Sequence, residues 1–401
     1  MTTTMNETTT FALTTTRRVL ADALDTVGLA VATRPAVPVL AGVLITGHDD
    51  GSATLTGFDY HTAITVTLPD TVRVPGRLVV SHSELKGVLS ATAKGTPKRQ
   101  ADAAPVTFAR DDGTPSVTVD GYTVPFEEYP TNDYPTLPQA PPTLASMGRE
   151  RFVSELARVS VATIGPDWGL PMLETVRMEI ADDGHQLSMV ATDRYRLVWS
   201  ILPTLPENTA AGTGTVLAHG RALAKLTKKL TGDTVGIGIG DDLFAITCGS
   251  VRVLTRGHEA VGNFPTFRPL FPDTASVTVT ADRAELLKAT VRGRGILKAK
   301  KENGLSLTMT VTPDAVTIAP DLPGSTISPE MPAKTDGVTS GDLMRFGFNP
   351  EFLEDALSSI TADTLTLHAT ATTKPVVVTD GDENVSSAAY RHLLMPIRLS
   401  S

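Results

Sequence analysis

The most restrictive feature of this sequence is an internal repeat, because landmarks in its first part recur 133 or 134 residues later. Pro38 begins a stretch that passes through an Asp-Asp-Gly turn to Asp59. Pro171 begins a second stretch that passes through the same kind of turn to Asp193. The repeat is longer than the roughly 20 to 50 residues of solenoid units, so each copy can hold its own core. We therefore expect similar domains in series.

Both copies combine β-like alternation with a helical pattern. Apolar residues at positions 85, 88 and 89 follow His82 at helical spacing, and leucines at positions 223, 226 and 230 follow His219 in the same way. Spacings of three and four residues predict one buried helix face in each copy.

A more diverged third copy follows. Residues 283–301 predict a first helix and residues 305–318 predict strands. Asn349 suits the N-cap of a second helix, with Pro350 at its first position. Alternation at residues 364–368 predicts a further strand. Each copy thus has the order helix, strands, helix, strands, which predicts an α+β fold built from three repeated domains.

Proline-rich segments at residues 132–136 and 262–266 are typical of linkers between these copies. We expect an N-terminal tail at residues 1–10, followed by domains at residues 11–143, 144–272 and 273–401. A series of like domains can close into a ring by dimerisation, which also removes exposed strand edges.

Charge is segregated along the chain. The net charge is −9, from 35 Lys and Arg against 44 Asp and Glu, so any DNA binding requires clustered cations. Residues 281–301 carry seven basic residues against two acids, and residues 221–229 carry four against none. A single basic helix is more often a solvated face. Recurrence favours a basic helical layer that holds phosphates without reading bases, although the helix that follows Asn349 is acidic.

Cys248 is the only cysteine, which excludes an intramolecular disulfide and a cysteine-based zinc cluster. We expect it to be a buried small side chain in a protein of the reducing cytoplasm. No apolar run approaches the ~20 residues that cross a bilayer, and no membrane partner is expected.

An enzymatic alternative comes from Ser83 and Lys86, which match the S-x-x-K pattern of penicillin-recognising serine enzymes. The S-D-N and K-T-G motifs that accompany this pattern are missing. The histidines show no paired spacing typical of a metal site. We therefore expect no catalytic residue, metal or cofactor.

Five segments together resemble the bacterial DNA polymerase III beta subunits, or sliding clamps, in order and spacing. They are RPAVPVL at residues 34–40, ATDRYRL at 191–197, NFPTF at 263–267, FGFN at 346–349 and LMPIRL at 394–399. The resemblance implies a non-catalytic processivity subunit that encircles DNA as a head-to-tail homodimeric ring, with helices lining the hole and sheets outside. It implies double-stranded DNA, the DNA polymerase III alpha subunit, the clamp loader and other proteins with clamp-binding motifs as partners.

The resemblance also assigns site residues. It implies a groove between the second and third domains that binds partner peptides, formed by Leu173, Thr192, Arg194, Tyr195, Arg196, Leu197, Pro265, Leu270, Asn349, Phe352, Leu393, Met395, Pro396, Ile397, Arg398 and Leu399. For contact with DNA, the resemblance implies Arg34, and the basic helices supply the other expected residues, namely Arg158, Arg221, Lys225, Lys228, Arg292, Lys298, Lys300 and Lys301. The expected dimer interface pairs Val124 and Phe126 with Ile296 and Leu297.

Three groove positions depart from the family pattern. Arg194 stands where many members have Gly, Pro269 where some have a basic residue, and Phe352 where Tyr is frequent. These departures leave two alternatives open: a specialised second clamp copy with altered partner or inhibitor binding, and a scaffold that does not encircle DNA.

Overall fold

The computed structural model describes residues 11–110, 113–207, 214–240, 242–258, 263–323, 328–341, 343–381 and 384–399. The expected tail at residues 1–10 lies outside the described residues. The chain divides into two compact units. Unit 1 comprises Met1–Arg151, Leu205–Val216 and Ala222–Gly257, and unit 2 comprises Phe152–Thr204, Leu217–Arg221 and His258–Ser401. The second copy of the repeat is therefore shared between the units.

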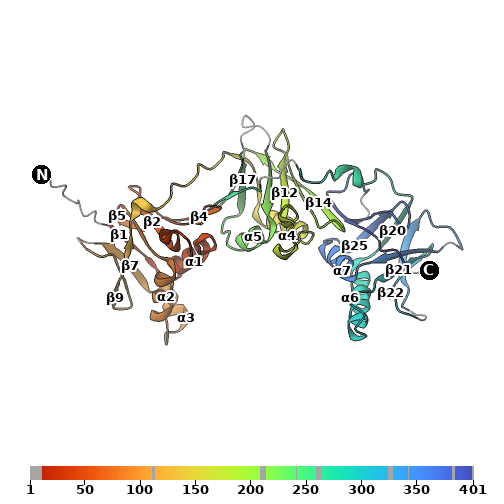
Figure 1. Cartoon of the computed structure of the whole chain (residues 1–401), viewed down its shortest axis with the longest axis horizontal. Helices are drawn as coiled ribbons and strands as arrows, with labels where there is room; N and C mark the ends of the chain where they lie inside the picture. Colours follow the sequence, from red (N-terminus) through yellow and green to blue (C-terminus); the bar gives the residue numbers. More distant parts are fainter. Residues whose placement is uncertain are drawn as a thin grey trace. The chain divides into compact units, whose positions relative to one another are not determined.

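Unit 1 contains two antiparallel sheets and three helices. The helices are α1 (Arg17–Val27), α2 (His82–Thr92) and α3 (Lys98–Ala103) (Figure 1). The smaller sheet has the order β5 (Val72–Val74), β1 (Phe11–Thr16), β7 (Pro105–Arg110), β8 (Ser116–Val119), β9 (Tyr122–Pro125). The larger has the order β10 (Glu128–Tyr129), β6 (Gly76–Ser81), β2 (Gly42–Gly47), β3 (Ala53–Phe58), β4 (Thr62–Leu68), β19 (Val251–Arg256), β18 (Leu243–Cys248), β17 (Thr234–Ile239), β11 (Thr143–Gly148), β15 (Leu205–Pro206).

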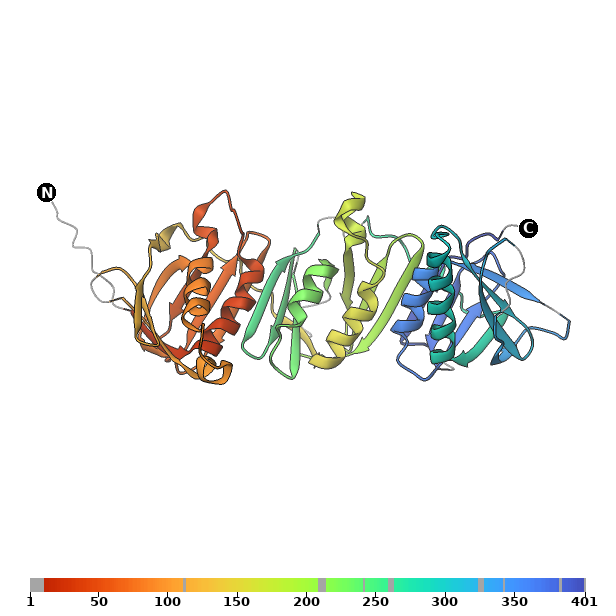
Figure 2. The same cartoon turned by 90° about the horizontal axis from the view of Figure 1, so that it is seen from below.

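Unit 2 is built on one antiparallel sheet. Its strands have the order β16 (Gly214–His219), β12 (Thr175–Ile180), β13 (Gln186–Thr192), β14 (Arg196–Pro203), β27 (Tyr390–Leu394), β26 (Val376–Asp380), β25 (Thr364–Ala369), β20 (Val277–Asp282), β23 (Met331–Asp336), β22 (Ala315–Pro320), β21 (Leu307–Val311), β24 (Met344–Phe348). Its helices α6 (Arg283–Ala299) and α7 (Pro350–Ser359) lie side by side in both views (Figures 1 and 2). Two further helices, α4 (Arg149–Ser160) and α5 (Gly220–Thr227), are shared between the units.

Sheet pairing joins successive copies of the repeat. β4 of the first copy pairs with β19 of the second, with Val66 opposite Val251. β14 of the second copy pairs with β27 of the third, with Leu197 opposite Leu393. Pairing of this kind satisfies strand edges that would otherwise be exposed. The predicted α+β class is confirmed, and the copies share continuous sheets.

Helices α2, α6 and α7 each begin directly after a capping side chain, and the cap expected at Asn349 is one of them. Ser81 caps α2 by accepting a hydrogen bond from the Glu84 backbone N–H, and Asp282 caps α6 in the same way from Glu285. Asn349 caps α7 by accepting from the backbone N–H groups of Glu351 and Phe352. These bonds satisfy donors that have no partner inside the helix.

The repeat is also visible in its turns. Asp59, between β3 and β4, accepts hydrogen bonds from the backbone N–H groups of His61 and Thr62 at 2.9 and 2.7 Å. Asp193, between β13 and β14, accepts from Tyr195 and Arg196 at 3.0 and 2.9 Å. The aspartates recognised as repeat landmarks therefore close equivalent turns.

Apolar side chains of the paired strands β14 and β27 are part of a buried core. One buried cluster in unit 2 consists of Val190, Leu197, Phe267, Phe271, Val377, Val385 and Leu393. Cys248 of unit 1 is buried as expected, and burial raises the pKa of its thiol. Among the described residues, no helix combines the length and apolarity required to cross a membrane.

Candidate functional site

The turn before β14 and the segment after β27 lie next to each other in unit 2. Arg196 is opposite Leu394 in the paired strands. Just beyond this pair, the backbone N–H of Met395 donates to the carbonyl of Tyr195 at 2.9 Å. The backbone N–H of Ile397 then donates to the carbonyl of Gly347 in β24 at 2.8 Å. The C-terminal segment therefore links the two halves of the expected groove.

Large apolar side chains are exposed along this segment. The exposed fraction is 53% for Tyr195, 42% for Met395 and 42% for Ile397. The ring of Tyr195 stacks on Phe352 of α7 with centroids 6.3 Å apart. We call Tyr195, Phe352, Met395 and Ile397 the apolar surface. Exposed apolar groups gathered in one place are typical of an interaction site.

Arg196 links α7 to the turn before β14. Its Nε donates to Asp193 at 2.9 Å and its Nη1 donates to Asp355 of α7 at 2.6 Å. Its guanidinium carbon lies 4.4 Å from the centroid of the Phe352 ring. Arg196 is buried. Its guanidinium therefore forms its ion pairs within the chain, and it positions Phe352.

The remaining groove residues divide into supporting and exposed groups. Thr192 donates to the Arg196 carbonyl at 2.7 Å, and Asn349 caps α7. Three leucines that support the surface are buried, namely Leu173, Leu197 and Leu393. Pro396 and Leu399 are half-buried, whereas the exposed positions are Arg194, Pro265, Leu270 and Arg398. The neighbouring departure, Pro269, is exposed in the 3-10 helix Arg268–Leu270.

Arg158 of α4 is not placed to contact DNA. It is buried and pairs with Glu155 at 2.6 Å and with Asp380. Its Nε donates to the Ser359 carbonyl at 2.6 Å, and its guanidinium carbon lies 3.6 Å from the centroid of the Tyr390 ring. The expected contact of Arg158 with phosphates is therefore corrected to a role in the interior of unit 2, because the side chain is buried and each of its three nitrogen atoms donates a hydrogen bond within the chain.

The other expected DNA-contacting residues are exposed. They are Arg34, Arg221 and Lys225 of α5, Lys228 just beyond α5, Arg292 and Lys298 of α6, and Lys300 and Lys301 just beyond α6. None of them forms an ion pair with another residue that the structure describes. Unpaired cations of this kind are available to phosphate groups.

The acidic character of α7 has a structural explanation. Arg294 of α6 pairs with Glu354 at 2.8 Å and with Glu351 at 4.0 Å, and Asp355 pairs with Arg196. Three acids of α7 therefore face basic partners within unit 2. The acids of the helix that breaks the charge rule thus face Arg294 of α6 and Arg196 at the start of β14.

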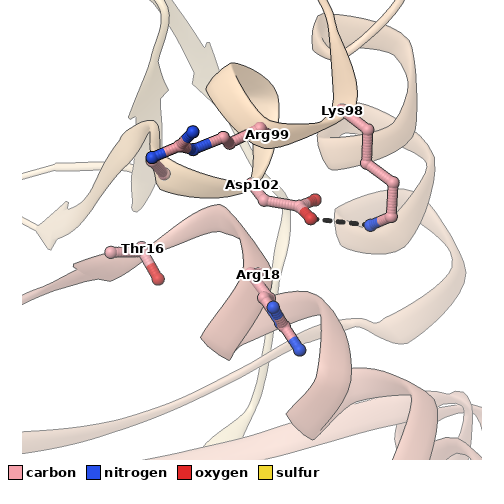
Figure 3. A pocket seen from close by; sticks show the side chains of 6 residues that line it. Thr16, Arg18, Lys98, Arg99 and Asp102 are labelled. Atoms are coloured by element: carbon pink, nitrogen blue, oxygen red, sulfur yellow. Dashed lines mark hydrogen bonds and ion pairs between the residues drawn. The ribbon is translucent and has the colours of Figure 1, made fainter.

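Two basic residues of unit 1, Lys98 and Arg99, were missed in the sequence. Arg18 of α1 and Lys98 and Arg99 of α3 line a hollow of about 580 Å³ together with Thr16 and Asp102 (Figure 3). Lys98 pairs with Asp102 at 2.6 Å. With only six residues, α3 is too short to show an apolar period. The adjacent Lys98 and Arg99 were nevertheless a sign of local positive charge in the sequence.

The expected dimer residues differ in exposure. Phe126 is 1% exposed and its ring centroid lies 5.9 Å from that of Phe108, and Leu297 is 2% exposed. Val124 of β9 is half-buried, and Ile296 of α6 is 44% exposed. In the sheet as described, β9 is a terminal strand with one free edge. Within each predicted pair, Val124 and Ile296 are the residues available at the surface.

Ser83 and Lys86 of the S-x-x-K pattern make other contacts. Lys86 pairs with Asp25 of α1 at 2.6 Å, and the Ser83 hydroxyl is 3.2 Å from the Ser81 hydroxyl. Within the described ranges, no three His, Cys, Asp or Glu side chains are grouped so that they could hold a metal ion.

Comparisons with known proteins match nearly the whole chain. Models of the DNA polymerase III beta subunit match its N-terminal domain at residues 11–138, its central domain at 147–266 and its C-terminal domain at 268–398. The chain is 30% identical to the beta sliding clamp of Streptomyces coelicolor, covering 96% of this chain and 98% of that protein. It is 28% identical to the beta sliding clamp homolog GriR of Streptomyces muensis, covering 95% and 98%.

A solved structure shares the fold. The sliding clamp of Pseudomonas aeruginosa bound to griselimycin superimposes with a TM-score of 0.78 at 21% identity, covering 97% of this chain and 100% of that chain. The fold is therefore the three-domain clamp fold. The chain belongs to the DNA polymerase III beta subunit family, the family of the beta sliding clamps.

Proposed function

We propose that this sliding clamp works as a head-to-tail homodimer that closes around duplex DNA and holds partner proteins at the apolar surface. The observation that carries the proposal is the presence of two kinds of exposed group in one chain: unpaired cations on α5 and α6, and apolar side chains at the end of β27. The first suits phosphates, and the second suits a short peptide.

The cations favour sliding over fixed binding. Exposed Lys and Arg side chains attract phosphates without reading bases, so their attraction does not depend on sequence. The hollow lined by α1 and α3 adds the exposed Arg99 to these cations, whereas Arg18 and Lys98 beside it pair with Asp22 and Asp102. No catalytic role is part of the proposal, because the clamp acts by tethering.

The apolar surface favours peptides with aromatic or aliphatic anchors. Tyr195 and Phe352 provide a stacked aromatic face, and Met395 is a flexible neighbour that adapts to different anchors. We propose the DNA polymerase III alpha subunit, the clamp loader and other proteins with clamp-binding motifs as partners, in the cytoplasm. Griselimycin, bound to the Pseudomonas aeruginosa clamp, is a candidate ligand of this chain.

A loading assay tests the ring. The chain, a matched clamp loader and ATP are incubated with nicked circular DNA, and retained protein is measured after gel filtration at increasing salt. A ring stays on circles and is lost when the DNA is cut to linear form. A scaffold that does not encircle DNA is retained on neither form, and this result would reject the proposal.

A peptide assay tests the partner surface separately. Tyr195→Ala and Met395→Ala are expected to lower affinity for a clamp-binding peptide by about tenfold each, because each removes a buried contact of the complex. Leu205→Ala is the matched control, since Leu205 is 69% exposed and lies on β15 of unit 1. Equal loss in the control would count against a specific surface.

A second candidate function is a specialised clamp copy with altered partner or inhibitor binding. The similarity to GriR, a clamp homolog, and the presence of Arg194 and Phe352 favour it. Titration with griselimycin, beside the beta sliding clamp of Streptomyces coelicolor, distinguishes the two. Affinity within about threefold of that clamp would favour the main replicative role.

We also propose domain boundaries at residues 11–143, 144–272 and 273–401. The matched segments at residues 11–138, 147–266 and 268–398 support them. The first boundary falls at the start of β11 (Thr143–Gly148), so limited proteolysis is expected to cut first in the segment just before this strand and near residues 272–273, and fragments ending inside β4 or β14 would contradict the boundaries.

A further inference from the structure

The turn before β14 contains a backbone conformation that side chains rarely adopt. Arg194 has φ +80°, in the left-handed region that favours glycine. The turn is closed by other residues: Asp193 accepts from the backbone N–H groups of Tyr195 and Arg196, and the Thr192 hydroxyl accepts from that of Arg194 at 3.2 Å. The arginine side chain contributes nothing to this closure.

The equivalent turn in unit 1 shows that the conformation belongs to the fold. Tyr60 has φ +73° and follows Asp59, just as Arg194 follows Asp193. The repeat fixes the backbone at this position and leaves the side chain free to vary. Glycine would fit the turn with less strain, so the turn itself does not require an arginine at position 194.

The guanidinium of Arg194 stands beside the apolar surface. Its central carbon lies 5.9 Å from the centroid of the Tyr195 ring, which is itself stacked on Phe352. Arg194 is exposed and forms no ion pair with any residue in the described ranges, whereas Arg196 is buried between Asp193 and Asp355. Arg196 thus forms its ion pairs within the chain, whereas Arg194 is exposed to solvent.

We infer that Arg194 selects partner segments that carry an acidic side chain next to their apolar anchors. The inference rests on the proposed function of the apolar surface. Arginine binds a carboxylate through two parallel hydrogen bonds, and such bonds are strong among polar contacts. Anchors seated on Tyr195 and Phe352 would displace water close to the guanidinium, which strengthens its attraction for a carboxylate. Charge complementarity of this kind sets specificity more than overall affinity.

A matched peptide set tests the inference on the full-length chain. Peptides with the same Leu and Phe anchors carry Asp at one flanking position in turn, and each is compared with its Asn counterpart by calorimetry. We expect the wild-type chain to prefer one Asp peptide by about five- to tenfold, and the preference to shrink as salt is raised. In Arg194→Gly the ratio of the two affinities should fall to about one.

Two further variants make the result specific. Arg194→Lys keeps a charge without the bidentate geometry, so it should retain part of the preference. Arg252→Gln removes an exposed arginine from β19 of unit 1 and should leave the preference as in the wild type. Thermal unfolding of Arg194→Gly should occur at the same or a higher temperature, because glycine relieves the strained φ.

The possible results distinguish a failure of selection by Arg194 from a failure of the proposed docking at the apolar surface. If Asp and Asn peptides bind the wild type equally at every position, or the preference survives in Arg194→Gly, the inference is wrong while the docking surface stands. If no peptide binds and Tyr195→Ala changes nothing, the proposed docking function fails, and the inference fails with it.

Discussion

At the scale of single residues, buried arginines organise unit 2. Arg158 joins α4 to Asp380 at the end of β26 and to the carbonyl of Ser359 at the end of α7. Glu155, its neighbour on α4, also accepts a hydrogen bond from Ser200 of β14 at 2.8 Å. These contacts connect residues of the second and third copies of the repeat.

Replacing Arg158 by Met should therefore destabilise the chain strongly. The substitution leaves Glu155 and Asp380 without their cation in a mostly buried site, which typically costs about 3 to 5 kcal/mol. Urea unfolding followed by circular dichroism measures the loss. Arg221→Met on exposed α5 is the control, with an expected change within about 0.5 kcal/mol. Equal, small losses in both variants would show that the network contributes little.

A second prediction concerns pH. Burial lowers the pKa of His392 to about 3, and the charges of Arg196 and Arg158 act in the same direction. The unfolded chain takes up a proton near the ordinary value of 6.5, and the folded chain does not. The contribution of neutral His392 is thus complete above that value and is lost as pH falls toward 3, by about 1.4 kcal/mol per pH unit.

The variant His392→Asn isolates this effect. Asn cannot titrate, so the free energy of unfolding should fall less steeply between pH 7 and pH 5 in the variant, by about 2 kcal/mol over that interval. Urea unfolding at several pH values provides both curves. Parallel curves would mean that His392 takes up its proton in the folded chain as readily as in the unfolded one.

At the scale of elements, α7 links the apolar surface to the interior. Asn349 caps its first turn, Phe352 stacks on Tyr195, and Glu354 pairs with Arg294 of α6. The exposed pair contributes little, since ion pairs in solvent are typically worth about 0 to 1 kcal/mol. The cap and the aromatic stack therefore define where the helix begins and where Phe352 lies.

Asn349→Ala should lower the free energy of unfolding by about 1 kcal/mol, because two backbone N–H groups lose their acceptor. Asn349→Ser restores an acceptor and should recover most of that loss. The same variants tested with a clamp-binding peptide should show weaker binding for Ala than for Ser. Equal binding would indicate that Phe352 is held by Tyr195 and Arg196 alone.

The sequence predicted elements well where the signal was local. Asn349 lies next to the helix it caps, so this start was predicted from two residues, whereas the equally local caps at Ser81 and Asp282 were not among the expectations. The burial of Arg158 could not be read in this way, because Ser359 and Asp380 are about 200 residues away. The resemblance predicted the residues of the apolar surface. The ion pair of Arg196 with Asp355, which holds α7 beside that surface, is another contact between residues far apart in the sequence.

At the scale of the whole molecule, ring closure requires a surface on each end of the chain. The free edge of β9 in unit 1 and the exposed Ile296 on α6 in unit 2 supply candidates. Burial changes how the interface should be tested. Leu297 and Phe126 are part of the interior, so a charge at either position would disrupt the fold before it disrupted a dimer.

Ile296→Glu is therefore the variant that tests the dimer. Its side chain is 44% exposed, so the charge can be solvated in a monomer, but it would be buried without a partner in the proposed interface. Sedimentation velocity should show the wild type as a dimer and the variant as a monomer with unchanged circular dichroism. Val291→Glu, on the same helix and 47% exposed, controls for a general effect of charge. A variant at Ile296 that still sediments as a dimer would place the interface elsewhere, and retention on circular DNA should follow whichever variant breaks the dimer.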